Sequence, residues 1–137
     1  MKSNKGFSLV ELIVVIAIMA IIAGVAIPVY SAYITKAEES NAVQLCADAA
    51  YAAELANIEY GTTVTTAVTA NSATITFSGD DAALAAAQVA EIANDDAVAA
   101  SGAVVTITFE KELSDEGQAK ATDALDRLTT PAATPTN

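Results

Sequence analysis

The sequence predicts an α+β protein in which a long N-terminal helix, membrane-spanning in its first half, packs on a small C-terminal domain of short antiparallel strands and helices. Three observations lead to this expectation. Residues 12–29 are apolar and uncharged. An amphipathic pattern then continues to Tyr60. Beyond Gly61, segments rich in threonine, valine and isoleucine alternate with segments that begin with helix-capping residues, as in a mixed domain.

The apolar segment 12–29 has the sequence LIVVIAIMAIIAGVAIPV, and no charged residue lies between Glu11 and Lys36. A charge-poor apolar stretch of about 18 residues or more can cross a bilayer as a helix. Lys2 and Lys5 precede the segment, and every acidic residue except Glu11 follows it. Because basic residues favour the cytoplasmic side of a membrane, we expect the N-terminus to lie in the cytoplasm.

The second half of the predicted helix has a single apolar stripe. Apolar residues recur there at steps of three to five, mostly three or four, and most charged residues fall between them. No strong helix breaker lies between Val29 and Tyr60, and Gly61 ends the pattern. We therefore expect one helix from about Phe7 to Tyr60, roughly 80 Å long at 1.5 Å per residue. The stripe consists of Ile34, Ala37, Ala42, Leu45, Ala49, Ala52, Leu55 and Ile58.

The segment beyond Gly61 predicts a β-hairpin, a helix, a strand and a second helix. Threonine, valine and isoleucine are frequent in strands, and serine or aspartate often precedes a helix. Ser78, Asp80 and Asp81 are the expected caps and first-turn acids of the first of these helices. The expected elements are strands at Thr62–Thr69, Ala73–Ser78 and Ala103–Phe109, and helices from about Asp80 to Asn94 and from Ser114 to about Leu128.

The charge balance and the residue types exclude several functions. The chain of 137 residues has 17 Asp and Glu against 6 Lys and Arg, a net charge of −11. Such a surface repels phosphate backbones, so direct nucleic-acid binding is not expected. The chain has no histidine, no glycine-rich phosphate loop and no ligand cluster, which predicts no catalytic residue, cofactor or metal site. Cys46, the only cysteine, is expected to be a small packing residue on the helix.

Adjacent acidic residues occur as Glu38-Glu39, Asp80-Asp81 and Asp95-Asp96. Neighbours on a helix point about 100° apart, so a solvated face is expected rather than an acid/base pair. The pairs at residues 80 and 95 also lack the alternating ligand spacing of a calcium loop. Helix caps and a solvated surface are therefore the preferred interpretation of these acids.

The residues that carry the chemistry lie at Lys5–Glu11, KGFSLVE. Gly6 would present bare backbone to a membrane-embedded peptidase, where a side chain would obstruct the site. Phe7 would then become a new N-terminus with a positive amine. Glu11 follows four residues later, one helical turn on, at the edge of the apolar segment. A charged group inside a bilayer costs at least ~2.5 kcal/mol, so such a carboxylate is expected to have a partner and a function.

The segment Lys5–Pro28, KGFSLVELIVVIAIMAIIAGVAIP, resembles the class III leader and N-terminal helix of the type IV pilin superfamily. The resemblance implies that a prepilin peptidase cuts between Gly6 and Phe7 and N-methylates Phe7. It also implies that Glu11 neutralises the Phe7 amine of an adjacent subunit in a filament.

The resemblance further implies a structural role rather than an enzymatic one. Gly24 and Pro28 match positions where the helix of this family is often loosened. The implied partners are the prepilin peptidase, copies of the chain and other pilin subunits, the inner-membrane assembly machinery and the membrane. The implied location is a single pass through the cytoplasmic membrane, followed by a surface filament or a periplasmic or wall-spanning pseudopilus.

Several alternatives remain open at this point. The filament is either a type IV pilus or the pseudopilus of a type II secretion-like or DNA-uptake machine, and a disulfide-closed C-terminal loop is impossible with one cysteine. Outside the family, the segment could be an ordinary signal peptide or the anchor of a non-polymerising surface protein. The expected parts are a leader 1–6, a transmembrane and assembly part 7–29, an amphipathic part 30–60, a globular domain 61–129 and a disordered tail 130–137.

Overall fold

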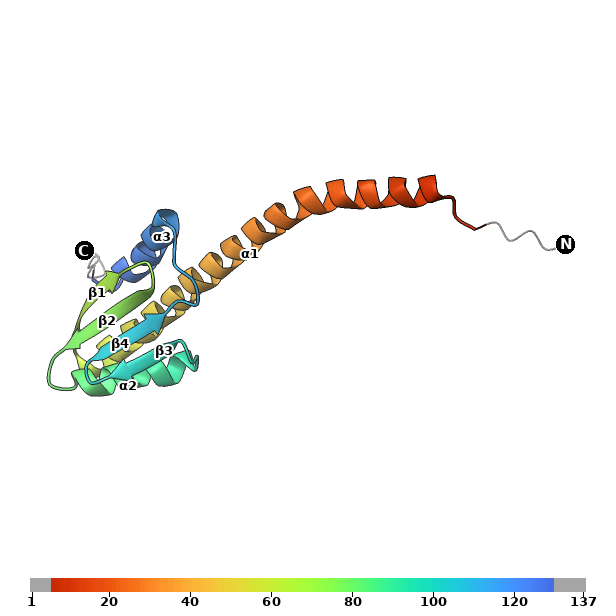
Figure 1. Ribbon diagram of the computed structural model, residues 1–137. Helices are drawn as coiled ribbons and strands as arrows, with labels where there is room; N and C mark the ends of the chain where they lie inside the picture. Colours follow the sequence, from red (N-terminus) through yellow and green to blue (C-terminus); the bar gives the residue numbers. More distant parts are fainter. Residues whose placement is uncertain (1–5, 130–137) are drawn as a thin grey trace, which may run out of the picture. The chain divides into compact units, whose positions relative to one another are not determined.

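The computed structural model describes residues 6–129, so most of the expected leader and the expected tail 130–137 lie outside the described residues. The chain divides into two compact units, the first ending at Lys36 and the second beginning at Ala37. Figure 1 labels the elements in chain order. They are α1 (Leu9–Tyr60), β1 (Thr63–Val68), β2 (Ser72–Ser78), α2 (Ala82–Ala93), β3 (Val98–Ser101), β4 (Val104–Thr108) and α3 (Asp115–Asp126).

The first unit consists of the N-terminal part of α1, which confirms the predicted long helix. Helical structure begins at Leu9 and is assigned without a break through Pro28. Among the described residues, α1 is the one helix that is long and apolar enough to cross a membrane, and its most apolar window is not buried by the rest of the chain. Large side chains such as Ile21, which is 70% exposed, have no protein partner in the single chain.

The second unit contains a four-stranded antiparallel sheet with the order β1-β2-β4-β3. The predicted hairpin is confirmed, with Thr63 opposite Ser78 and Val68 opposite Ala73. The predicted strand near residue 103 is β4, which pairs with β2 and β3. The sequence analysis missed β3, whose sequence VAAS carries no strand signal. It forms because the turn at Gly102, with a φ of 58°, brings it back along β4.

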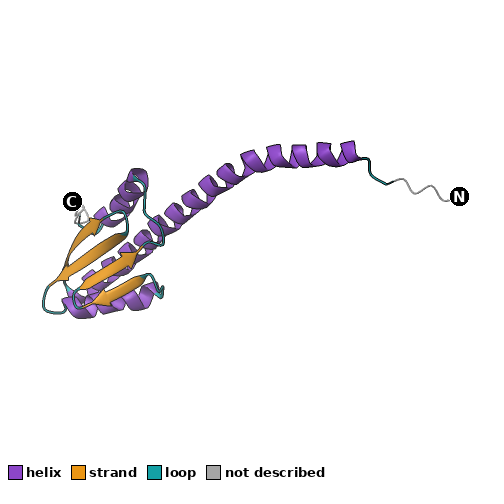
Figure 2. Ribbon diagram, in the orientation of Figure 1, coloured by secondary structure: helices purple, strands orange, loops and turns teal. Residues whose placement is uncertain are grey.

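The core of the second unit lies between the sheet and the helices on one of its faces (Figure 2). Along each strand the buried and exposed positions alternate, as in β2. The inward-facing residues of β2 and β4 share one hydrophobic core with a face of α1 made of alanine and cysteine and with residues of α2 and α3. The buried residues of α1 are Ala42, Cys46, Ala49, Ala50, Ala52, Ala53 and Ala56.

This buried face corrects the predicted apolar stripe. The sequence analysis placed Leu55 and Ile58 in the stripe, but they are 41% and 77% exposed. Ala42, Ala49 and Ala52 of the predicted stripe are buried, as expected, and the buried face also includes Cys46, Ala53 and Ala56. The prediction included large apolar side chains, whereas the buried residues of α1 are all alanines and Cys46.

The two short helices begin differently. Ser114 caps α3, as expected, and its hydroxyl oxygen accepts a hydrogen bond from the Gly117 N–H at 3.2 Å. Asp81 occupies the N-cap position of α2 but makes no side-chain capping hydrogen bond, and the first turn of α2 contains no acidic residue. The expectation of capping and first-turn acids was therefore wrong for α2, although the helix itself lies where it was predicted.

Candidate functional site

The residues before α1 hold the first two candidate site residues. Gly6, Phe7 and Ser8 are not helical, and the Phe7 side chain is 94% exposed. A Cβ added to Gly6 would meet no atom within 4 Å. The peptide bond between Gly6 and Phe7 is therefore outside the helix and accessible, which is what a peptidase requires of a substrate.

Ser8 and Glu11 form a reciprocal cap on the first turn of α1. The Ser8 hydroxyl oxygen accepts from the Glu11 backbone N–H at 3.2 Å. In return, Glu11 Oε2 accepts from the Ser8 backbone N–H at 3.0 Å and from the Ser8 hydroxyl at 3.2 Å. The backbone bond from Leu12 N–H to the Ser8 carbonyl, 3.2 Å long, closes the turn. Such a capping box satisfies two donors that a helix start leaves without partners.

The capping box changes the expected surroundings of Glu11. The sequence analysis described Glu11 as one helical turn from Phe7, but Phe7 precedes the helix. Within the described residues, the structure brings the Glu11 carboxylate to Ser8 and not to Phe7. Sequence reasoning missed Ser8, although the pattern Ser-x-x-Glu before an apolar run is a known signature of a helix start.

Gly24 and Pro28, the expected points of loosening, both lie inside α1. Proline has no N–H, so the Gly24 carbonyl cannot receive the helical hydrogen bond that residue 28 would otherwise donate. A Cβ at Gly24 would meet no side chain within 4 Å, so no packing contact fixes this stretch. The helix is continuous here, but it lacks one of its backbone hydrogen bonds.

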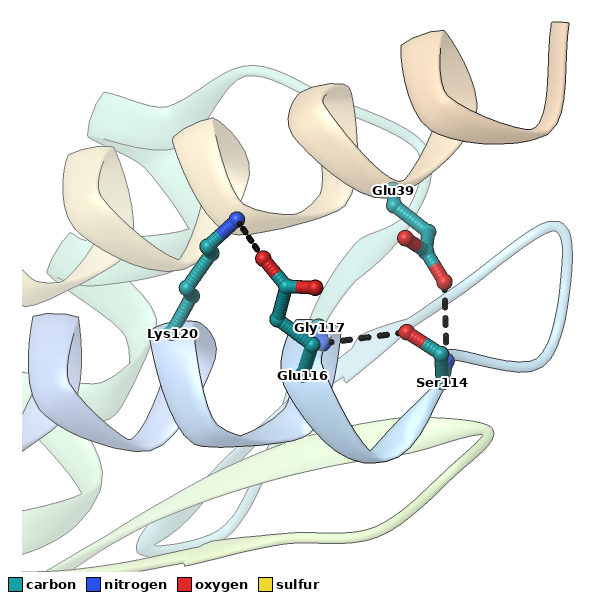
Figure 3. A network of polar contacts seen from close by, with 5 residues as sticks. All are labelled: Glu39, Ser114, Glu116, Gly117 and Lys120. Atoms are coloured by element: carbon teal, nitrogen blue, oxygen red, sulfur yellow. Dashed lines mark hydrogen bonds and ion pairs between the residues drawn. The ribbon is translucent and has the colours of Figure 1, made fainter. Parts of the chain in front are cut away.

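The second unit has a polar junction between α1 and α3, shown in Figure 3. Glu39 on α1 accepts a hydrogen bond from the Ser114 backbone N–H through Oε1 at 2.9 Å. The neighbouring Glu38 forms an ion pair with Lys111, with 3.4 Å between Oε2 and Nζ. Both glutamates are partly exposed, and in addition both contact the segment that leads into α3.

Glu39 completes the cap of α3 from another helix. In a capping box, a glutamate at the third helical position accepts from the N-cap N–H. Here that position is Gly117, and Glu39 supplies the carboxylate instead. A Cβ at Gly117 would lie 3.4 Å from Leu113 side-chain atoms and 3.5 Å from Glu39 Cδ, so a longer side chain would displace one of them. Hydrogen bonds from the Ser114 side chain and backbone lower the pKa of Glu39.

Cys46 is fully buried in the core, which confirms the prediction of a packing residue. Burial raises the pKa of its thiol to about 11, so the thiolate is disfavoured at neutral pH. In residues 6–129, no group of three or more His, Cys, Asp or Glu side chains is placed to hold a metal ion. The candidate residues Gly6, Phe7 and Glu11 lie in the N-terminal segment.

Comparison with known proteins points to the same segment. Residues 1–27 match the family described as the prokaryotic N-terminal methylation motif. The chain is 49% identical over 45 residues to a fimbrial protein of Moraxella nonliquefaciens, covering 33% of this chain and 29% of that protein. It is 42% identical over 59 residues to a fimbrial protein of Pseudomonas aeruginosa, covering 43% of this chain and 38% of that protein.

A further relative is the prepilin peptidase-dependent protein D of Escherichia coli strain K12, which is 39% identical over 61 residues, 44% of this chain and 42% of that protein. The chain thus spans less than half the length of the relatives it matches. No solved structure matches it significantly. The methylation motif, the long apolar helix and these relatives show that the N-terminal part of the chain is similar to that of type IV pilins and prepilins.

Proposed function

We propose that this chain is a structural subunit of a type IV pilus or pseudopilus filament, polymerised through the first part of α1. The observation that carries the proposal is the N-terminal segment. It combines a methylation motif over residues 1–27 with a capped helix whose apolar side chains have no partner in the single chain. The role is structural, and the proposal assigns no catalytic residue to this chain.

The proposed processing takes place at the peptide bond between Gly6 and Phe7. A prepilin peptidase hydrolyses this bond, which leaves a carboxyl group on Gly6 and a free amine on Phe7. The open backbone at Gly6 and the exposed Phe7 support this site. N-methylation of the Phe7 amine keeps its positive charge. The mature chain would lose Lys2 and Lys5, so its side-chain charge would change from −11 to −13, the loss of two positive charges.

The proposed assembly contact joins Glu11 of one subunit to the Phe7 amine of its neighbour. In the membrane, the apolar side chains of residues 12–29 would lie in lipid, and in the filament they would contact other helices. Water is scarce in such a helix bundle, where an unpaired carboxylate or amine is penalised by several kcal/mol. Pairing the two groups offsets both penalties. It also works at one axial offset only, so it would set the register between subunits.

The proposed partners and locations follow from these steps. The chain would meet the prepilin peptidase, copies of itself or other pilins, and the inner-membrane assembly machinery. It would cross the cytoplasmic membrane once, with its N-terminus inside, before entering a surface filament or a pseudopilus. A pseudopilin of a secretion or DNA-uptake machine is the second candidate, and a non-polymerising anchored surface protein is the third.

Two measurements test the proposed function. Mass spectrometry of the mature chain should find Phe7 at the N-terminus, and replacing Gly6 by a bulky residue should leave the precursor in the membrane. An N-terminus near Ile27 would instead indicate an ordinary signal peptidase. Electron microscopy of sheared fibres, with mass spectrometry for this chain, should find it in a filament. Long fibres rich in this chain favour a pilus subunit, and its complete absence from any fibre or pseudopilus would contradict the proposal.

A further inference from the structure

Ser8 has no role in the proposed function, yet it donates every hydrogen bond that the Glu11 side chain accepts within the described residues. The Ser8 N–H lies 3.0 Å and the Ser8 hydroxyl 3.2 Å from Glu11 Oε2. Both bonds converge on the same oxygen. The other carboxylate oxygen, Oε1, accepts no hydrogen bond from residues 6–129. The two oxygens of this carboxylate are therefore in different environments.

We propose that Ser8 is a positioning residue for filament assembly, which holds the Glu11 carboxylate through Oε2 and leaves Oε1 to the amine of the neighbouring subunit. This inference rests on the proposed function. A carboxylate has about four acceptor sites, so Ser8 and an amine can bind it together. A glutamate side chain that is already held loses less rotamer freedom when it pairs, which favours the contact between subunits.

The position of the cut agrees with this role. Hydrolysis between Gly6 and Phe7 adds one water across that bond and changes no atom of Ser8 or Glu11. The Ser8 N–H remains a backbone amide after the cut. A cut one residue later would turn this donor into a charged terminal amine, which could pair with Glu11 of its own chain instead of a neighbour's. The capping box found in the precursor is thus retained in the mature subunit.

Two substitutions separate the two oxygens' roles. Glutamine also forms the capping box at this helix position, so Glu11→Gln keeps the helix start but removes the charge. Ser8→Ala does the reverse, because it removes the hydroxyl and keeps the Glu11 charge. Ser8→Thr keeps the hydroxyl and serves as the conservative rescue. Ser31→Ala is a matched control, since the Ser31 carbonyl rather than its hydroxyl accepts from Thr35.

The experiment co-expresses each full-length variant with the parent chain and uses mass spectrometry to measure the variant-to-parent ratio in membranes and in sheared fibres. Ser8→Ala should be cleaved normally, and its ratio should fall about fivefold from membrane to fibre, as the loss of one hydrogen bond of ~1 kcal/mol to the Glu11 carboxylate predicts. Ser8→Thr and Ser31→Ala should stay within about twofold of the parent, as surface changes with no lost contact do. Adding Ser8→Ala to Glu11→Gln should cause no further loss.

Three outcomes would overturn the inference, and they differ in what they say of the proposed function. If Ser8→Ala enters fibres like the parent while Glu11→Gln does not, Ser8 has no positioning role but the filament function stands. If Ser8→Ala lowers incorporation equally with and without Glu11→Gln, Ser8 acts on the helix and not through the carboxylate. If Glu11→Gln itself enters fibres like the parent, the proposed assembly contact fails, and the role of Ser8 fails with it.

Discussion

The two parts of α1 differ in side-chain size and in what covers them. Before Lys36, the helix is rich in isoleucine and valine, and these side chains are exposed in the single chain. After Ala37, the buried positions are alanines and Cys46, packed against the sheet. Large apolar side chains offer much area to lipid or to neighbouring helices, whereas small ones allow a sheet of the same chain to approach. One helix thus carries two kinds of apolar surface.

The largest expected effect comes from truncating one isoleucine in each of the two compact units. Ile75 on β2 is fully buried, and Ile75→Ala should lower the free energy of unfolding of the second unit by about 2–5 kcal/mol. Ile21 is 70% exposed, so Ile21→Ala should leave this free energy unchanged. Denaturant unfolding of the full chain in detergent micelles, followed by NMR signals of sheet amides, measures both. If the two substitutions lower the free energy of unfolding equally, the exposed side chains of the first unit also stabilise the second unit, and the comparison fails.

The second-largest expected effect on stability comes from replacing one alanine by leucine in each part of α1. Ala53 is fully buried, and Ala53→Leu should lower the free energy of unfolding of the second unit by about 1–3 kcal/mol because the larger side chain must displace neighbouring core residues. Ala20 lies in the exposed part of the helix, so Ala20→Leu should not destabilise the second unit. The same unfolding measurement compares them. If Ala53→Leu leaves the free energy of unfolding unchanged, close packing around Ala53 is not required.

A third prediction concerns the loosened stretch of the first part, which is expected to leave the second unit unaffected. In a filament, Gly24–Pro28 should extend, because the Gly24 carbonyl has no helical donor and Gly24 is a weak helix former. Pro28→Ala restores that donor and should keep the stretch helical, which shortens the subunit. Electron microscopy maps of filaments test this directly. A straight unbroken helix through residues 24–28 of the parent chain in the filament would contradict the predicted extension.

The smallest expected effect is a pH dependence confined to the second unit. Hydrogen bonds from Ser114 lower the pKa of Glu39 from its ordinary value of 4.5. The stability that this contact contributes is therefore complete above 4.5 and is lost as the pH falls through the lower folded-state pKa. Hydrogen exchange at the start of α3 should rise in this acid range. Glu39→Gln should remove that dependence, while Glu91→Gln, an exposed control on α2, should keep it. If the pH dependence of hydrogen exchange is unchanged in Glu39→Gln, other acidic residues are its cause.

The sequence by itself determined the elements that depend on local interactions. Periodicity and the lack of breakers placed α1, alternation placed β2 and β4, and the Ser114 cap placed the start of α3. The motif at Gly6, Phe7 and Glu11 could also be recognised in the sequence, because it depends only on residue types and their spacing. The Ser8 cap was equally local, and the pattern was present in the sequence but was not recognised there.

Only the tertiary structure decided which face of α1 is buried, that VAAS forms a strand, and that Glu39 caps another helix. These features depend on partners far apart in the chain, since Glu39 and Ser114 are 75 positions apart. Alanine is compatible with helix, strand, core and surface, so its own properties did not select among them. The shared core made the selection, because the buried face of α1 has to fit together with side chains of the sheet, α2 and α3.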